Sequence, residues 1–197
     1  MTTLAWHFVV TCNGQPVLRD GTPLPAVGEW LTHHGPLVLC TSGLHASVRA
    51  IDALRYAPGE TLCRVECDGE MLDGGDKLVC RQRRVLWSAD ATDVLRAFAR
   101  RCALDVVHLW RAPAVVKEYL DTGREDLRSA ARAAARAAAG AAAGDAAWAA
   151  AWAAAGVAAW AAAGAAAWAA AGDAVGDAAW ARYGLWLEDS LSALEEK

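Results

Sequence analysis

The chain has 197 residues, a formal net charge of -4 and 21% charged residues. This modest acidic balance excludes a general binder of phosphate backbones, because nucleic-acid affinity comes largely from clustered Lys and Arg that neutralise phosphates. The start of the chain has no basic segment ahead of an apolar run, so we expect no signal peptide, a cytoplasmic location and reduced cysteines.

Composition divides the chain into two parts. Residues 1–110 have the mixed composition of a folded domain and hold all five His, whereas residues 129–181 are mostly Ala, Gly and Trp. We therefore expect the α+β class: a small mixed head domain with a mainly antiparallel sheet over residues 1–110, followed by an all-α tail over residues 111–197.

The head opens with a predicted hairpin. Residues 4–12 (LAWHFVVTC) read as a strand, and the pair Asn13-Gly14 after it is the strongest short hairpin signal. Further short strands are expected at residues 28–32 and 37–40. Ser47 is the expected N-cap of a helix over residues 48–56.

The second half of the head predicts two strands and a helix. Residues 61–68 alternate like a half-buried strand, with Cys63 and Cys67 on the same side as Val65. Residues 77–87 predict either a strand pair or one long bent strand. A helix capped by Asp90 or Thr92 runs to about residue 109, with a core-facing stripe of Val94, Leu95, Phe98, Cys102, Leu104 and Val106.

The tail is a degenerate four-residue repeat. Every fourth position from Arg128 to Gly184 holds only Arg, Gly or Trp, and the positions between them are nearly all Ala. These three residues share no packing property, but the codons CGG, GGG and TGG differ only in their first base. We interpret the tail as a twelve-nucleotide unit that expanded by slippage and was then altered by point changes.

Alanine favours helix strongly enough to outweigh the cost of each Gly. The helix is expected to begin near residue 123, where Thr122 and Glu125 have the spacing of a capping box and Asp126 adds a second acid to the first turn. A four-residue period drifts around an α-helix, so the tail could be one long helix, a helical hairpin or a bundle, and the sequence leaves these alternatives open.

Two surfaces of the tail are candidate interaction sites. One is the set of repeat tryptophans, Trp148, Trp152, Trp160, Trp168 and Trp180. The other is a basic helix face, for which a solvated surface is the simpler reading, made by Arg124, Arg128, Arg132 and Arg136. Residues 146–172 carry no charge, but Ala is barely hydrophobic and no Leu, Ile or Phe occurs there, so we expect no membrane insertion.

Several segments together resemble an uncharacterised domain family of actinobacterial phages and prophages. They are the opening Trp6-His7-Phe8, residues 40–47 (CTSGLHAS) with residues 52–56 (DALRY), the strand at residues 63–66, and the Ala/Trp tail. The resemblance covers the whole chain. It implies a small accessory protein of a mobile element and brings no activity or residue roles with it.

The head also resembles the ADP-ribosyltransferase core. In that family a strand with an aromatic or His residue is followed by a Gly-hydrophobic-His/Tyr-x-Ser segment that leads into a helix. His7, His45, Ser47 and Tyr56 stand at matching places, and His7, His45 and Tyr56 become the candidate catalytic residues. The family usually has a Glu on a late strand, whereas here Glu66 and Glu70 come early and the later strand offers Gln82. The resemblance implies an NAD-binding enzyme.

A metal site is the other chemical option. Only Cys63 and Cys67 have a spacing close to that of zinc ligands, and they lie on a predicted strand rather than in a knuckle, so we expect no metal and no cofactor. The leading hypothesis is a non-enzymatic phage accessory protein that acts by homo-oligomerisation through the tail or by binding a host or phage protein. The alternative is the ADP-ribosyltransferase-like enzyme or NAD-binding domain.

Overall fold

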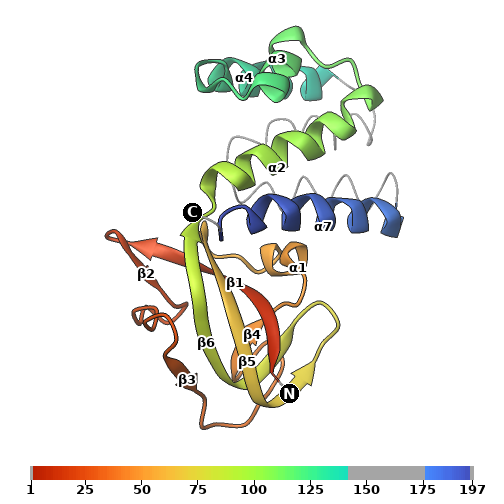
Figure 1. Cartoon of the computed structure of the whole chain (residues 1–197). Coiled ribbons are helices and arrows are strands. Elements are labelled where there is room, and N and C mark those ends of the chain that lie inside the picture. The colour runs from red at the N-terminus through yellow and green to blue at the C-terminus, as the bar shows by residue number, and fades with distance from the viewer. Residues whose placement is uncertain (1, 142–175, 196–197) are drawn as a thin grey trace. The chain divides into compact units, whose positions relative to one another are not determined.

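The computed structural model describes residues 2–141 and 176–195. Its contacts divide the chain into a head unit, Met1–Ala91 with Glu188–Lys197, and a helical unit, Thr92–Leu187. This division falls earlier than the expected boundary after residue 110, because helix α2 (Thr92–Asp105) packs on helix α3 (Ala114–Thr122). Figure 1 shows the elements of both units.

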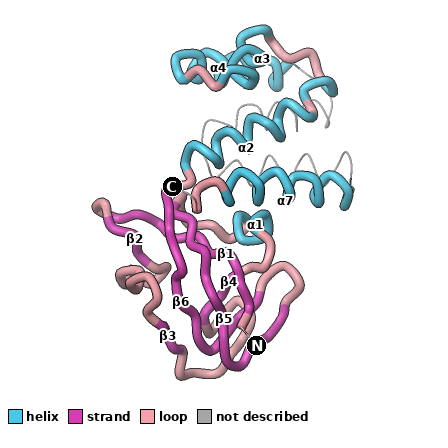
Figure 2. The backbone as a smooth tube through the Cα atoms, viewed as in Figure 1, coloured by secondary structure: helices cyan, strands magenta, loops and turns pink. Residues whose placement is uncertain are grey.

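A curled antiparallel sheet forms the head unit, as expected from its alternating segments (Figure 2). Its strand order is β2-β1-β5-β6-β3, and β4 also pairs with β6, beside a different stretch of that strand from β3. The strands are β1 Thr3–Cys12, β2 Gln15–Val17, β3 Trp30–Thr32, β4 Leu44–Ala46, β5 Thr61–Asp73 and β6 Leu78–Asp90.

The predicted hairpin between β1 and β2 is confirmed. Cys12 pairs with Gln15, which leaves Asn13 and Gly14 as a two-residue loop. Both loop residues have positive φ, 51° and 78°, as a type I′ turn requires and as Asn-Gly readily adopts.

Strands β5 and β6 form a long hairpin at the centre of the sheet. The segment at residues 77–87 is therefore one long strand rather than a strand pair. Register shifts occur between Arg64 and Val65 and between Asp68 and Met71, where bulges bend the strands and let the sheet curl.

Two expectations for the head were wrong. Residues 37–40 form a turn closed by a bridge between Val38 and Ser42, while β4 follows where no strand was expected. Ser47 does not cap a helix: its backbone pairs with that of Trp6, and the short helix α1, Ala50–Leu54, begins later. The pairing with β1 holds Ser47 in extended backbone, which removes it from the cap position.

Four α-helices of the described chain belong wholly or partly to the helical unit. They are α2, α3, α4 (Glu125–Ala141) and α7 (Gly176–Ser192), with a short 3-10 turn, Val107–Leu109, after α2. Of the expected α2 stripe, Leu95, Phe98 and Cys102 are buried, as is Val106 just after the helix. The residues Val94 and Leu104 are only half-buried.

Helix α3 was not expected, and it displaces the predicted capping box. Thr122 is the last residue of α3, and its hydroxyl donates to the Glu118 carbonyl. The same oxygen accepts a hydrogen bond of 3.3 Å from the Arg124 N–H, but α4 begins only at Glu125, so Thr122 is not its N-cap. Gly123 ends α3 in the left-handed conformation, with φ 69°, and α4 begins at Glu125.

Helix α7 contributes to both units. Its residues up to Leu187 belong to the helical unit and those from Glu188 to the head unit, and Tyr183, Leu187 and Leu191 are fully buried. Most of the repeat, residues 142–175, lies outside the described residues, and so do the alternatives of one helix, hairpin or bundle. Within the described ranges, no helix is both long and apolar enough to cross a bilayer.

Candidate functional site: a basic cluster in the head unit

Three cysteines lie in the interior of the head sheet. Cys63, Cys67 and Cys80 are all 0% exposed and pack with Val65 and Val85 in one apolar cluster. The expected grouping of Cys63 and Cys67 with Val65 is therefore confirmed. Burial raises the pKa of the Cys63 thiol to about 12, so this thiol is neutral at physiological pH.

Arg83 lies among these thiols and is only 6% exposed. It stands opposite Cys67 in the pairing of β5 with β6, and its guanidinium donates to the carbonyl oxygen of His45. Burial lowers the pKa of Arg83, and the neighbouring groups that oppose this shift are the three thiols. No Asp or Glu among the described residues forms an ion pair with it.

Cys67 and Cys80 interact directly. The Cys67 thiol donates to the sulfur of Cys80, and this hydrogen bond raises the pKa of Cys67 and lowers that of Cys80. The Cys80 sulfur also lies 3.2 Å from the carbonyl oxygen of Leu44, a hydrogen bond that only the neutral thiol can donate. Cys80 therefore donates here as a neutral thiol, although the hydrogen bond from Cys67 and the charge of Arg83 lower its pKa.

His7, on β1, is half-buried and pairs in register with Cys63. Its pKa lies well below the ordinary value because of burial first, and then because of the positive charges of Arg83 and Arg19 and the nearby ring of His45. The sequence placed His7 among the candidate residues, and the structure brings it close enough to His45 for the two rings to interact electrostatically.

His45, on β4, is also half-buried, and its ring is held by backbone hydrogen bonds. Its Nε2 accepts a hydrogen bond of 3.0 Å from the Cys40 backbone N–H, and it also hydrogen-bonds to the Gly43 backbone. Burial lowers its pKa, and the charges of Lys77, Arg83 and Arg19 lower it further. The ring is therefore a neutral acceptor at Nε2.

These groups define a basic cluster: His7, Arg19, His45, Lys77 and Arg83. Arg19 is exposed, Lys77 is half-buried and Arg83 is buried, so the cluster runs from the surface into the sheet. Every charged group that acts on the two histidines is basic. An arrangement of this kind favours an anion and disfavours a cation.

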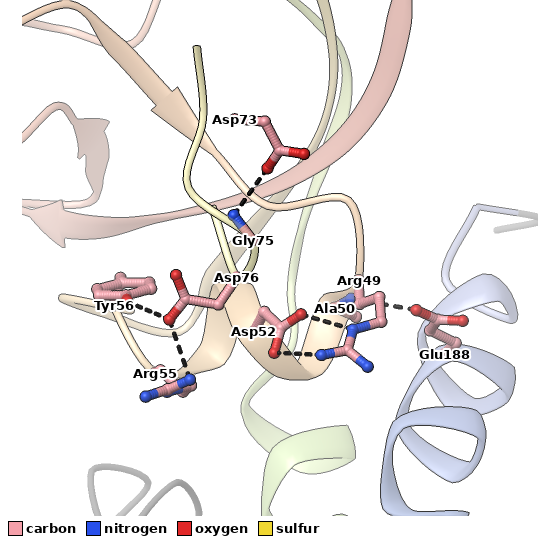
Figure 3. A network of polar contacts seen from close by, with 9 residues as sticks. All are labelled: Arg49, Ala50, Asp52, Arg55, Tyr56, Asp73, Gly75, Asp76 and Glu188. Atoms are coloured by element: carbon pink, nitrogen blue, oxygen red, sulfur yellow. Dashed lines mark hydrogen bonds and ion pairs between the residues drawn. The ribbon is translucent and has the colours of Figure 1, made fainter. Parts of the chain in front are cut away.

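Tyr56, the third candidate, lies at the outer side of this cluster. Its hydroxyl donates to Asp76 at 2.5 Å (Figure 3). The Lys77 ammonium lies 4.1 Å from its ring centroid. Arg55 also pairs with Asp76, at 3.0 Å, and Arg19 donates to the Tyr56 carbonyl at 3.1 Å. The hydroxyl that a catalytic role would use is thus bound to a carboxylate, which raises the pKa of Tyr56.

Figure 3 also shows how the chain after the repeat reaches the head unit. The Glu188 carboxylate accepts a hydrogen bond of 3.2 Å from the Ala50 N–H at the start of α1, beside the pair of Arg49 and Asp52. Helix α1 has no side-chain cap of its own. Glu188 thus takes the role that the sequence assigned to Ser47, and a contact across 138 positions leaves no local sequence signal.

The predicted basic face of α4 is partly neutralised. Arg124, just before the helix, pairs with Glu118 at 3.1 Å and with Asp126 at 2.5 Å, and Arg128 pairs with Glu125 at 3.1 Å. Arg132 and Arg136 are exposed.

Of the repeat tryptophans, only Trp180 in α7 falls within the described residues, and the sites at residues 148, 152, 160 and 168 lie outside them.

Helix α7 is held in the helical unit by a cluster that sequence reasoning missed. Asp105 at the end of α2 accepts hydrogen bonds from Arg182 and, at 2.7 Å, from the Tyr183 hydroxyl. Arg101 lies 3.6 Å from the ring centroid of Trp186. The i, i+4 spacing of Tyr183 and Leu187 was the available signal, but the Ala-rich pattern around it concealed the apolar stripe.

In the described chain, no three His, Cys, Asp or Glu side chains form a group that could hold a metal ion. All six cysteines are free.

Comparison with known proteins gives one match. Residues 11–97 match a family described as a domain of unknown function (DUF7666). The match includes residues 40–56 and the strand at residues 63–66, on which the resemblance to an uncharacterised family rested. It does not include His7 or the repeat, although the resemblance was expected to cover the whole chain. No curated protein and no solved structure matches the chain.

Proposed function

We propose that this chain is a non-enzymatic accessory protein of a phage or prophage, acting in the cytoplasm by self-assembly or by binding a host or phage protein. The repeat of residues 128–184 is the assembly or spacer element. The observation that supports this proposal best is that the two ends of the repeat that the structure describes lie in packed helices of the same compact unit, so the repeat is fixed at both ends.

The first fixed point is helix α4. Its Ala131 and Ala135 are buried, 2% and 0% exposed, in a cluster with Val116, Tyr119 and Leu120 of α3. Small side chains on α4 allow the two helix backbones to approach closely. The first residues of the repeat therefore belong to a packed helix pair, α3 and α4.

The second fixed point is helix α7. Its buried Tyr183 and the contacts of Arg182 and Trp186 with α2 hold the chain where the repeat ends. Four tryptophans in an alanine-rich insertion supply large apolar area, which suits association with a second copy or a partner.

The test is the molar mass of the full chain in solution, measured by light scattering, against a variant with Trp148, Trp152, Trp160 and Trp168 all changed to Ala. We expect an oligomer for the parent chain and a monomer for the variant. A truncation before α7 would be a poorer test because it removes buried residues. Trp30→Ala, at a head-unit residue 37% exposed, is the control and should leave the oligomer intact. A monomeric parent chain refutes self-assembly.

The alternative function is NAD binding by an ADP-ribosyltransferase-like head. The observation that favours it is that His7 and His45 lie in one basic cluster and Tyr56 lies at its outer side. Calorimetric titration with NAD tests it: binding that is lost in His45→Ala supports the alternative. No heat of binding, or unchanged binding in that variant, excludes it.

A further inference from the structure

We propose that Arg83 is the centre of an oxyanion-binding site in the head unit, made for a phosphate or phosphoryl group and completed by the other members of the basic cluster. The proposal is independent of self-assembly through the repeat, because all of its residues lie in the head unit.

Arg83 has no carboxylate counter-charge among the described residues. Moving a guanidinium out of water costs several kcal/mol, at the order of magnitude, unless an opposite charge and hydrogen bonds offset it. Arg83 is more than nine-tenths buried, and its guanidinium bonds to a single backbone carbonyl, that of His45. A guanidinium carries five N–H donors, so most of its capacity is unused by the described residues.

The groups around Arg83 do not supply a full counter-charge. Cys63 is a weak acid here, and Cys80, whose pKa is lowered by its hydrogen bond with Cys67, donates to the Leu44 carbonyl as a neutral thiol in this structure. The carboxylate that contacts Tyr56, Asp76, is already bound by Arg55 and Tyr56. An anion from solution would therefore neutralise charge that this unit leaves unbalanced.

The charge of the cluster favours a dianion over a monoanion. Arg19 and Arg83 act on both imidazoles, and Lys77 adds a third positive charge at His45. A bound anion raises the pKa of a nearby His, so His7 can gain a proton and become a further donor. A tetrahedral oxyanion with two charges accepts from several donors at once, and a guanidinium presents the matching fork. A monoanionic carboxylate would leave positive charge in excess.

Inorganic phosphate is the probe, and thermal unfolding of the full chain is the measurement. A ligand that binds only the folded state raises the midpoint as its concentration rises. We expect phosphate to raise the midpoint and sodium chloride at equal ionic strength not to do so. ADP forms a second arm: tighter binding than phosphate indicates a nucleotide source for the phosphoryl group, and equal binding indicates that free phosphate suffices.

Arg83→Met is the decisive variant, because Met keeps the length and apolar character of the side chain without the charge. We expect it to abolish the phosphate response and to raise the midpoint of the ligand-free protein, as removing an uncompensated buried charge should. Arg84→Met is the matched control one residue along the same strand. Arg84 pairs with Glu66 at 2.5 Å and belongs to a different ion pair, so this variant should keep the phosphate response.

Arg19→Met tests the exposed side of the cluster without a risk to folding. We expect it to weaken phosphate binding about threefold, since an exposed charge is partly screened by salt. The proposal is overturned if phosphate stabilises no more than sodium chloride, or if the response persists in Arg83→Met. A ligand-free Arg83→Met protein much less stable than the parent also overturns it, because the charge would then have an internal partner.

Discussion

Replacing Leu187 by Ala tests whether α7 is truly packed at the end of the repeat. Leu187 is 0% exposed, whereas Leu185, two residues earlier on the same helix, is 68% exposed. Truncating a fully buried Leu removes its transfer free energy and leaves a cavity, which together cost about 2–5 kcal/mol. The same truncation at an exposed position costs within about 0.5 kcal/mol.

Urea unfolding followed by circular dichroism measures both variants. With a slope of about 2 kcal/mol per molar urea, a loss of about 3 kcal/mol lowers the midpoint by about 1.5 M. Leu185→Ala should unfold within a few tenths of a molar of the parent. Equal midpoints for the two variants would refute the anchoring of α7 and, with it, the view of the repeat as an insertion between fixed points.

Three further predictions concern single contacts of the head and helical units. Gly59→Ala should destabilise the head unit by more than 1 kcal/mol, at the order of magnitude, because a Cβ there would lie 2.6 Å from the Val10 Cα and 2.7 Å from the Val9 carbonyl oxygen; urea unfolding measures it. Tyr183→Phe should cost about 1.5–3 kcal/mol by losing the bond to Asp105, and an unchanged midpoint would show that this bond adds nothing. The pKa of His7 in the folded protein is below 6.5, so the unfolded protein binds more protons below pH 6.5. The stability that neutral His7 contributes should therefore be complete above pH 6.5. It should decline as the pH falls from 6.5 towards the pKa of His7 in the folded protein. His7→Gln should flatten this decline between pH 7 and pH 5, with His45 beside it as the remaining contributor.

Local sequence signals predicted the parts of the fold that depend on interactions between residues close together in the chain. The Asn13-Gly14 turn follows from the positive φ that its two positions require, and the core side of β5 follows from strict alternation. Ser47 and Thr122 were assigned to helix caps because they have the right chemistry. Tertiary pairing with Trp6 and the unforeseen helix α3 gave both residues other bonds.

The basic cluster was only half predictable. A family resemblance selected His7 and His45, but Arg83 stands in a run with Arg81 and Arg84, and no local pattern distinguishes the buried one. The bulge between Asp68 and Met71 alters the register of β5 against β6 near this run, and bulges are not visible in composition or periodicity. The contact of Glu188 with Ala50 depends on the return of the chain after the repeat.

Buried side chains recur at every fourth residue at both described ends of the repeat. Ala131 and Ala135 in α4 and Tyr183 in α7 are buried, and each occupies the slot just before the Arg, Gly or Trp position of the tetrad, while Leu187 and Leu191 continue the same spacing past the end of the repeat. Positions four apart lie on the same side of a helix, so this slot faces the packing partner at both flanks. Within α4 the slot that follows is exposed at Arg132 and Arg136, so packing constrains one slot of the tetrad there and leaves the next free to vary. In α7 the corresponding Gly184 is buried beside Tyr183, so a larger residue there would have to displace its neighbours.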